Sequence, residues 1–120
     1  MLVIREANVT VMVSDMKAAI QFYTDTLGLK LKARYGDEFA QVEAPGVIIA
    51  LHPKSGGLAG QSRTENLSIG FAVDSLEAEM NRLKGRGVRF SRVVDDAQVR
   101  LAFFTDPDGN PLYLSQSKWG

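Results

Sequence analysis

The sequence predicts an α+β fold made of two tandem βαβββ modules. Three observations carry this prediction. An alternating strand pattern followed by a capped helix occurs twice, three short strand-like runs follow each helix, and a polar, Gly/Ser-rich connector separates the halves. We place module 1 at about residues 1–53, the connector at 53–65 and module 2 at about 66–117, all within a single domain, 1–120.

The first half opens with a strand and a helix. Valines alternate with other residues over 8–13, which is the period of a half-buried strand. Asp15 is placed to cap a helix, and apolar residues then recur at helical spacing as far as Leu27. Gly28 stands where a left-handed backbone would end that helix. Three strands are expected after it, at roughly 29–35, 38–44 and 46–52.

The second half repeats this order. Apolar residues alternate over 66–73, and Asp74 and Glu77 form a D-x-x-E pattern that is typical of a capping box. An apolar helical stripe follows and ends at Gly87, at the same distance from its aspartate as in the first half. Strands are expected at roughly 88–94, 99–105 and 111–116, and the segment Asp106–Gly109 between the last two has the residues of a type I turn.

Each four-stranded unit with one helix has one covered sheet face and one open face. We expect the two units to form a curved mixed sheet with a concave groove and with the helices on its outer face. Phe103 and Phe104 are consecutive in a strand and must face opposite sides, so one of them should line the groove. The sheet surface and edges that remain favour a homodimer, in which Trp119 is either an interface anchor or part of a loose tail.

Composition excludes several classes of function. Fourteen basic residues balance fourteen acidic ones, so no charge excess favours nucleic acid or an anionic membrane. No N-terminal apolar run resembles a signal peptide or a membrane span, and we expect a cytoplasmic protein. The chain has no cysteine, and His52 is its one histidine, so a thiolate or multi-histidine metal site cannot form within one chain.

Three stretches together carry a resemblance to a known family. They are "VSDMKAAIQFYTDTLGLKL", "AVDSLEAEMNRLKGRGV" and "FTDPDGNPLYL". With the paired βαβββ units they resemble the glyoxalase/bleomycin-resistance/dioxygenase superfamily, also called the vicinal oxygen chelate superfamily. The resemblance covers nearly the whole chain, but its motifs do not distinguish one function within the superfamily from another.

The resemblance implies four positions where metal-dependent members carry His, Gln or Glu ligands. In this sequence those positions are Asn8, Ala50, Ser68 and Tyr113. Alanine has no donor atom, and neutral amide or hydroxyl groups are weak ligands for divalent transition metals. We therefore expect no metal and no cofactor, as in the bleomycin-resistance branch of the superfamily.

His52 leaves two interpretations open. It is either a groove residue that contacts ligand or acts as a general base, or a solvated residue at the end of a strand. A metal site of Glu6, Glu43 and His52 is a further alternative.

The sequence thus favours a protein that binds a small organic molecule, with sequestration of an antibiotic or metabolite as the expected role. Two alternatives are a lyase, isomerase or dioxygenase that uses an atypical site around His52, and an interaction module with a vestigial groove. The expected ligand-binding residues are Asn8, Ala50, His52, Ser68 and Tyr113.

Overall fold

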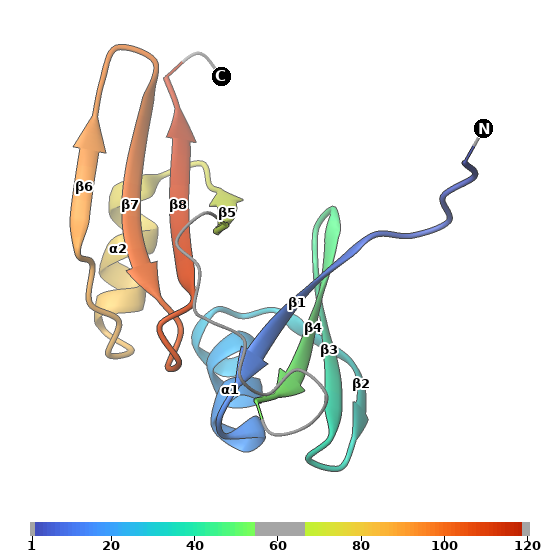
Figure 1. The fold of residues 1–120 in the computed structure, drawn as a ribbon. Helices are drawn as coiled ribbons and strands as arrows, with labels where there is room; N and C mark the ends of the chain where they lie inside the picture. Colours follow the sequence, from blue (N-terminus) through green and yellow to red (C-terminus); the bar gives the residue numbers. More distant parts are fainter. Residues whose placement is uncertain (1, 55–66, 119–120) are drawn as a thin grey trace. The chain divides into compact units, whose positions relative to one another are not determined.

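The two βαβββ modules predicted from the sequence are confirmed (Figure 1). The computed structural model describes residues 2–54 and 67–118, so most of the connector and Trp119 lie outside it. The chain divides into two compact units, residues 1–61 and 62–120. We call the described part of the first unit module 1 and that of the second module 2, and each is considered by itself.

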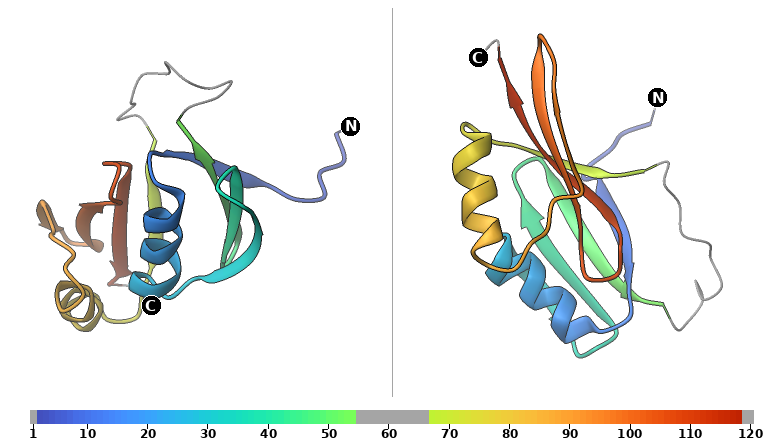
Figure 2. Two further views of the ribbon diagram at one scale, coloured as in Figure 1. Left: turned by 90° about the horizontal axis from the view of Figure 1, so that it is seen from below. Right: turned by 90° about the vertical axis from the view of Figure 1, so that its left-hand side faces the viewer.

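Module 1 forms a four-stranded mixed sheet in the order β1-β4-β3-β2. The helix leads the chain from β1 at one edge of the sheet to β2 at the opposite edge. The antiparallel pairs β2-β3 and β3-β4 then bring β4 beside β1, and these two strands are parallel. One face of this sheet is buried against the helix, as two further views show (Figure 2). The elements of module 1 are β1 (Asn8–Val13), α1 (Met16–Gln21), η1 (Phe22–Thr26), β2 (Lys30–Tyr35), β3 (Phe39–Ala44) and β4 (Val47–Pro53).

The first helix differs from the prediction in its second half. Its start is as expected, because the Asp15 side chain accepts a hydrogen bond from the Ala18 N–H at 3.1 Å. From Phe22 the helix widens to a π-helix, in which the Leu27 N–H donates to the carbonyl five residues back at 2.9 Å. The apolar spacing of this segment fits either helix type, so the sequence did not reveal the widening. Gly28 then takes the expected positive φ of 82°.

Module 2 forms a second mixed sheet in the order β5-β8-β7-β6, with β5 parallel to β8. The predicted strand at 88–94 begins later, at Arg92. The turn after the helix ends at Gly87, and residues 88–91 belong to no strand, although the Ser91 N–H already donates to the Phe103 carbonyl of β7 at 2.8 Å. The helix-covered face holds the buried side chains of Ala102, Phe104, Leu112 and Leu114, which face Leu76 and Leu83 of the helix. The elements of module 2 are β5 (Ile69–Ala72), α2 (Leu76–Lys84), β6 (Arg92–Asp95), β7 (Val99–Thr105) and β8 (Pro111–Ser117).

The predicted capping box at the start of α2 is wrong. Ser75 is the N-cap, and its hydroxyl accepts a hydrogen bond from the Ala78 N–H at 3.2 Å. This shift by one residue places Ala78 at the third helical position, so Glu77 cannot reach back as the box requires. The end of the helix is as expected, because Gly87 has a φ of 94° and the Val88 N–H donates to the Leu83 carbonyl at 3.0 Å.

Ser75→Ala should lower the free energy of unfolding by about 1 kcal/mol, because it removes the acceptor for a helix N-terminal N–H. Asp74→Ala is the matched control and should cost about 0.5 kcal/mol or less, through loss of charge near the helix start alone. Urea unfolding of the two variants measures this difference. A larger loss of unfolding free energy for Asp74→Ala than for Ser75→Ala would contradict the Ser75 cap and support the predicted capping box.

The segment Asp106–Gly109 forms a turn, as its sequence predicts, and a buried aspartate holds it. Asp106 is 3% exposed, and its Oδ1 accepts hydrogen bonds from the N–H groups of Asp108 and Asn110, both at 2.9 Å. Its Oδ2 accepts from the Asn110 side-chain amide at 2.7 Å. The Gly109 N–H donates to the Asp106 carbonyl at 3.0 Å and closes the turn. These contacts account for the aspartate without an acid–base role.

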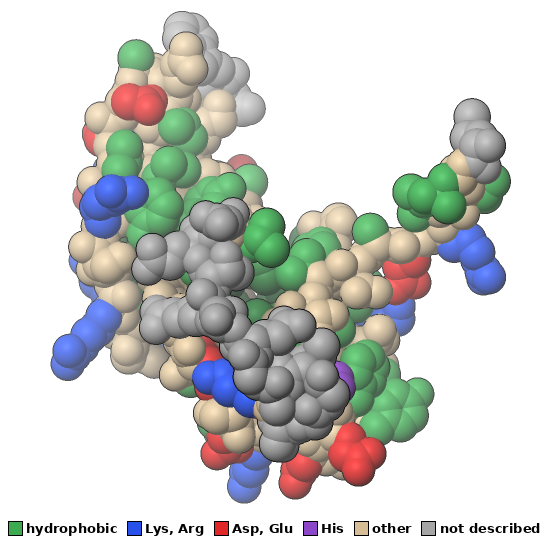
Figure 3. Space-filling model, viewed as in Figure 1, with side chains coloured by type: hydrophobic (Ala, Val, Ile, Leu, Met, Phe, Trp, Pro, Cys, Tyr) green, Lys and Arg blue, Asp and Glu red, His purple; other side chains and the backbone are tan. Residues whose placement is uncertain are grey.

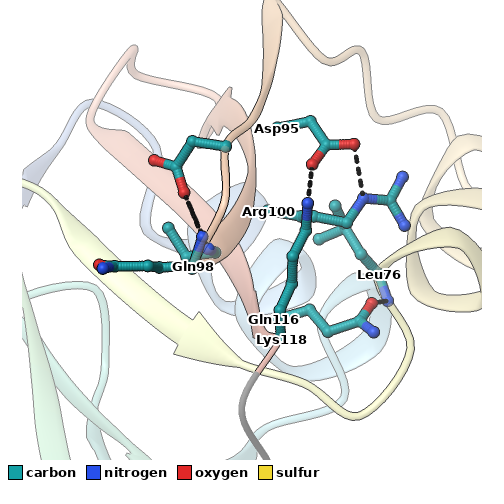
Figure 4. A network of polar contacts seen from close by, with 8 residues as sticks. Leu76, Asp95, Gln98, Arg100, Gln116 and Lys118 are labelled. Atoms are coloured by element: carbon teal, nitrogen blue, oxygen red, sulfur yellow. Dashed lines mark hydrogen bonds and ion pairs between the residues drawn. The ribbon is translucent and has the colours of Figure 1, made fainter.

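At the other end of this sheet, charged side chains join β6 to its neighbours (Figure 4). Asp95 accepts a hydrogen bond from the Lys118 ammonium, and its second oxygen lies 3.6 Å from Arg100 Nε. The Lys118 hydrogen bond, helped by the positive charges of both partners, lowers the pKa of Asp95 below its ordinary value. Nearby, the Gln116 side-chain oxygen accepts from the Leu76 N–H at 2.7 Å and so ties β8 to the start of α2.

This network predicts an acid-dependent contribution to stability. The folded-state pKa of Asp95 is depressed, so its contribution is present above the ordinary aspartate value of 3.8 and is lost as pH falls through the lower folded value. Asp95→Asn should therefore destabilise the protein at neutral pH and have little effect in strong acid. Urea midpoints of both proteins across this pH range test the expectation, and a constant difference at every pH would contradict it.

Candidate functional site

Three of the predicted site residues lie on one sheet face of module 1, the face opposite the buried Val11 and Val13. Asn8 is on β1, and Ala50 and His52 are on β4. Thr10 pairs with Ala50 and Met12 with His52, so β1 and β4 present these residues side by side. Ala50 is only 4% exposed, whereas Asn8 is exposed and His52 is half-buried.

His52 has few polar contacts. Its Nδ1 lies 3.0 Å from the carbonyl oxygen of the adjacent Pro53. No carboxylate in residues 2–54 or 67–118 forms an ion pair with it. Glu6 instead pairs with Lys32 at 3.5 Å. Within those same ranges no three His, Asp or Glu side chains are grouped as metal ligands, so the alternative site of Glu6, Glu43 and His52 is not formed.

Module 1 also contains a shallow hollow of about 710 Å³ at the edge of the sheet where β2 begins and β3 ends. It is lined by Gly28–Lys30, Glu43–Ile48 and the segment before β1, and it does not include Ala50 or His52. Its charged side chains include the Lys32–Glu6 pair. The surface of this open hollow is more polar than apolar, whereas sites for organic ligands are usually enclosed and mostly apolar.

The other two predicted residues are in module 2. Ser68 is exposed and lies just before β5. Tyr113 is half-buried on β8 and pairs with Gly70 of β5. The ring of Tyr113 lies directly over this glycine: a Cβ at residue 70 would stand 2.2 Å from its Cζ and 2.5 Å from its hydroxyl oxygen. Only glycine leaves room for the tyrosine in this position.

Tyr113 belongs to a row of side chains that crosses all four strands of module 2. Its partner on β7 is Phe103, whose partner on β6 is Arg92. The rings of Phe103 and Tyr113 have centroids 5.8 Å apart, and Arg92 Cζ lies 4.7 Å from the Phe103 centroid. We call Gly70, Tyr113, Phe103 and Arg92 the aromatic row. Residues alternate across a strand, so the row lies on the sheet face that α2 does not cover, and this is the helix-free face of module 2.

The sequence anticipated part of this row. Phe103 and Phe104 do face opposite sides: Phe104 is 2% exposed on the helix side, and Phe103 is half-buried on the other. In the space-filling view, hydrophobic side chains gather over β7 and β8, with a basic side chain at the β6 edge (Figure 3). Arg92 was not a predicted site residue, because its place beside Phe103 depends on the register between β6 and β7.

At the four positions where the resemblance implies metal ligands, the residues present do not fit a divalent metal. Ala50 offers no donor atom, and the Tyr113 phenol lies against the β5 backbone. Asn8 and Ser68 add only a neutral amide and a hydroxyl, whereas zinc and related ions are held by imidazole, carboxylate or thiolate groups. What these four residues do instead remains a prediction.

Comparisons with known proteins agree with the fold. The chain is 28% identical over 123 residues to a probable lactoylglutathione lyase of Vibrio parahaemolyticus, covering 88% of this chain and 86% of that protein. The structure of TnmS3, an antibiotic-binding protein from Streptomyces sp. CB03234, is similar with a TM-score of 0.79 and 27% identity, over 98% of this chain and 99% of that one.

A further solved structure is a superfamily member from Sphaerobacter thermophilus, with a TM-score of 0.76 and 26% identity over 95% of this chain and 98% of that one. The sequence model of the Glyoxalase/Bleomycin resistance protein/Dioxygenase superfamily matches residues 7–114. The chain belongs to the Glyoxalase/Bleomycin resistance protein/Dioxygenase superfamily.

Proposed function

We propose that this protein binds a small organic molecule without a metal, and that it sequesters an antibiotic or a metabolite. The observation that carries the proposal is the chemistry at Asn8, Ala50, Ser68 and Tyr113, where metal-dependent relatives would hold their ion. The likeness to an antibiotic-binding protein supports a binding role. The half-buried rings of Tyr113 and Phe103 supply apolar surface of the kind that organic ligands contact.

The proposal includes a homodimer in the cytoplasm. Leu2, Val3 and Ile4 are between 69% and 83% exposed, which is unusual for three consecutive apolar side chains. A second copy that covered this segment would remove it from water. Neither helix described in the structure has the length or the run of apolar residues that crossing a bilayer needs. Sedimentation velocity of the purified chain tests the dimer, and a monomer at micromolar concentration would contradict it.

A thermal-shift screen tests the binding role. Aromatic and amphipathic compounds should raise the melting temperature, because a ligand that binds only the folded state stabilises it by mass action. The shift should be the same in a chelator as in added Zn²⁺ or Ni²⁺. A compound that stabilises the protein only with added metal would contradict metal-independent binding.

The second candidate is catalysis around His52, which the similarity to a probable lactoylglutathione lyase favours. In that case His52→Ala should abolish turnover of lactoylglutathione and leave the fold intact. Under the proposed binding role, the wild-type protein turns over no lactoylglutathione. Measured turnover in wild type that His52→Ala removes would replace the binding role by an enzymatic one.

A further inference from the structure

The chemistry of the aromatic row changes from one end to the other: it is aromatic at Tyr113 and positively charged at Arg92. At β5 and β8, the Tyr113 ring rests on the backbone of Gly70. In the middle is Phe103, and at β6 the row ends in the guanidinium of Arg92. Neighbouring strands are about 4.8 Å apart, so an apolar strip about 10 Å long separates the tyrosine strand from the arginine strand.

The charge at the end of this strip is not neutralised within the part of the chain that the structure describes. Arg92 is exposed, and none of the ion pairs among residues 2–54 and 67–118 includes it. Arg100 on β7 differs in this respect, because it pairs with Asp95. The guanidinium of Arg92 instead lies over the Phe103 ring, a cation–π contact that leaves its N–H donors for another acceptor.

From this arrangement we propose that the helix-free face of module 2 selects planar aromatic anions. The rings of such a ligand would lie along Tyr113 and Phe103, and its carboxylate, sulfonate or phosphate would accept hydrogen bonds from Arg92. Fused rings match the length of the strip better than one ring does. The inference rests on the proposed binding function and adds the chemical class of the ligand.

Three compounds with the same ring system distinguish binding of the aromatic rings from recognition of the anionic group. They are 9-anthracenecarboxylate, 9-anthracenemethanol and 9-anthracenemethylamine. Their fluorescence anisotropy reports binding to the full chain directly. The carboxylate should bind at least tenfold more tightly than the ammonium compound, with the neutral alcohol between them. Benzoate, which has a single ring, should compete weakly with the carboxylate probe.

Two substitutions test the residues. Arg92→Gln should weaken the carboxylate about tenfold, the factor equivalent to about 1.4 kcal/mol, and change the alcohol less than about twofold. Arg89→Gln is the matched control, because Arg89 is exposed, lies outside the row and carries the same charge. Gly70→Ala should weaken all three compounds, since its new Cβ would displace the Tyr113 ring. Circular dichroism would establish that each variant is folded.

The outcomes distinguish this inference from the broader proposal. If the three compounds bind equally and Arg92→Gln has no effect, the anionic preference is wrong while small-molecule binding stands. If Arg92→Gln or Gly70→Ala converts a dimer into a monomer, the face is covered by a second copy and the inference is overturned. If none of the compounds binds, the inference is wrong, and the thermal-shift screen then decides the broader proposal by itself.

Discussion

Asp106→Ala should lower the free energy of unfolding by about 3 kcal/mol. Asp106 is 3% exposed, and its carboxylate accepts hydrogen bonds from the Asp108 and Asn110 N–H groups and from the Asn110 side-chain amide. Alanine would leave these donors without their acceptor in a poorly hydrated turn, and each loss of this kind costs about 1–3 kcal/mol. We set the expected total near the lower end of their sum, because water can enter the vacated space.

The matched control for this substitution is Asp37→Ala. Asp37 is also an aspartate in a turn, but its side chain is 84% exposed and pairs with Arg34 at 3.1 Å. An exposed pair of this kind contributes about 0.5 kcal/mol or less. Urea unfolding of both variants measures the contrast. Equal, small losses would show that the Asp106 contacts do not hold the turn before β8.

Leu83→Ala should be the second large effect, with a loss of about 2–5 kcal/mol. Leu83 is 1% exposed on α2 and faces the sheet of module 2, so truncation removes apolar burial and leaves a cavity. Leu67→Ala makes the same chemical change at a side chain that is 72% exposed, and it should change stability by less than about 0.5 kcal/mol.

Hydrogen exchange gives this experiment a regional readout. The chain divides into two compact units, and Leu83 lies in the second. We expect Leu83→Ala to speed the exchange of amides in β7 and β8 more than that of amides in β3 and β4. Equal losses for Leu83→Ala and Leu67→Ala in urea unfolding would contradict the assignment of Leu83 to the core.

The order of elements could be predicted because each boundary has a local cause. Alternation over 8–13, the Asp15 cap and Gly28 each act over a few neighbouring residues, and the structure agrees with all three. The errors occurred where two local solutions are nearly equal in energy. Asp74 and Ser75 are adjacent residues that can both cap a helix, and the structure uses Ser75.

The site was less predictable because it depends on strand register. Alternation indicates which residues share a face, and it correctly separated Phe103 from Phe104. It does not indicate which residue lies beside which across a sheet. The contact of Tyr113 with Gly70 arises from a pairing between two strands far apart in the chain, and the contact of Arg92 with Phe103 arises from the register of the β6–β7 hairpin. A glycine in the middle of a strand was the one local signal of such a close approach.

Tyr113 bears on both the proposed metal-free binding and the aromatic row. The resemblance implies a metal ligand at this position, but a neutral phenol is not a group that divalent metals favour, and its ring packs over Gly70 and beside Phe103. In this chain, the residue at that position is part of an aromatic surface. This change is the physical basis for proposing binding in place of metal-assisted catalysis.

Metal stoichiometry tests the central claim most directly. The protein would be purified without chelator, offered Zn²⁺, Ni²⁺, Mn²⁺ and Fe²⁺ in turn, freed of unbound ions and assayed by elemental analysis. We predict far less than one ion per chain for every metal, and the same affinity for 9-anthracenecarboxylate before and after chelator treatment. One tightly held divalent ion per chain, whose removal also abolishes ligand binding, would contradict the account.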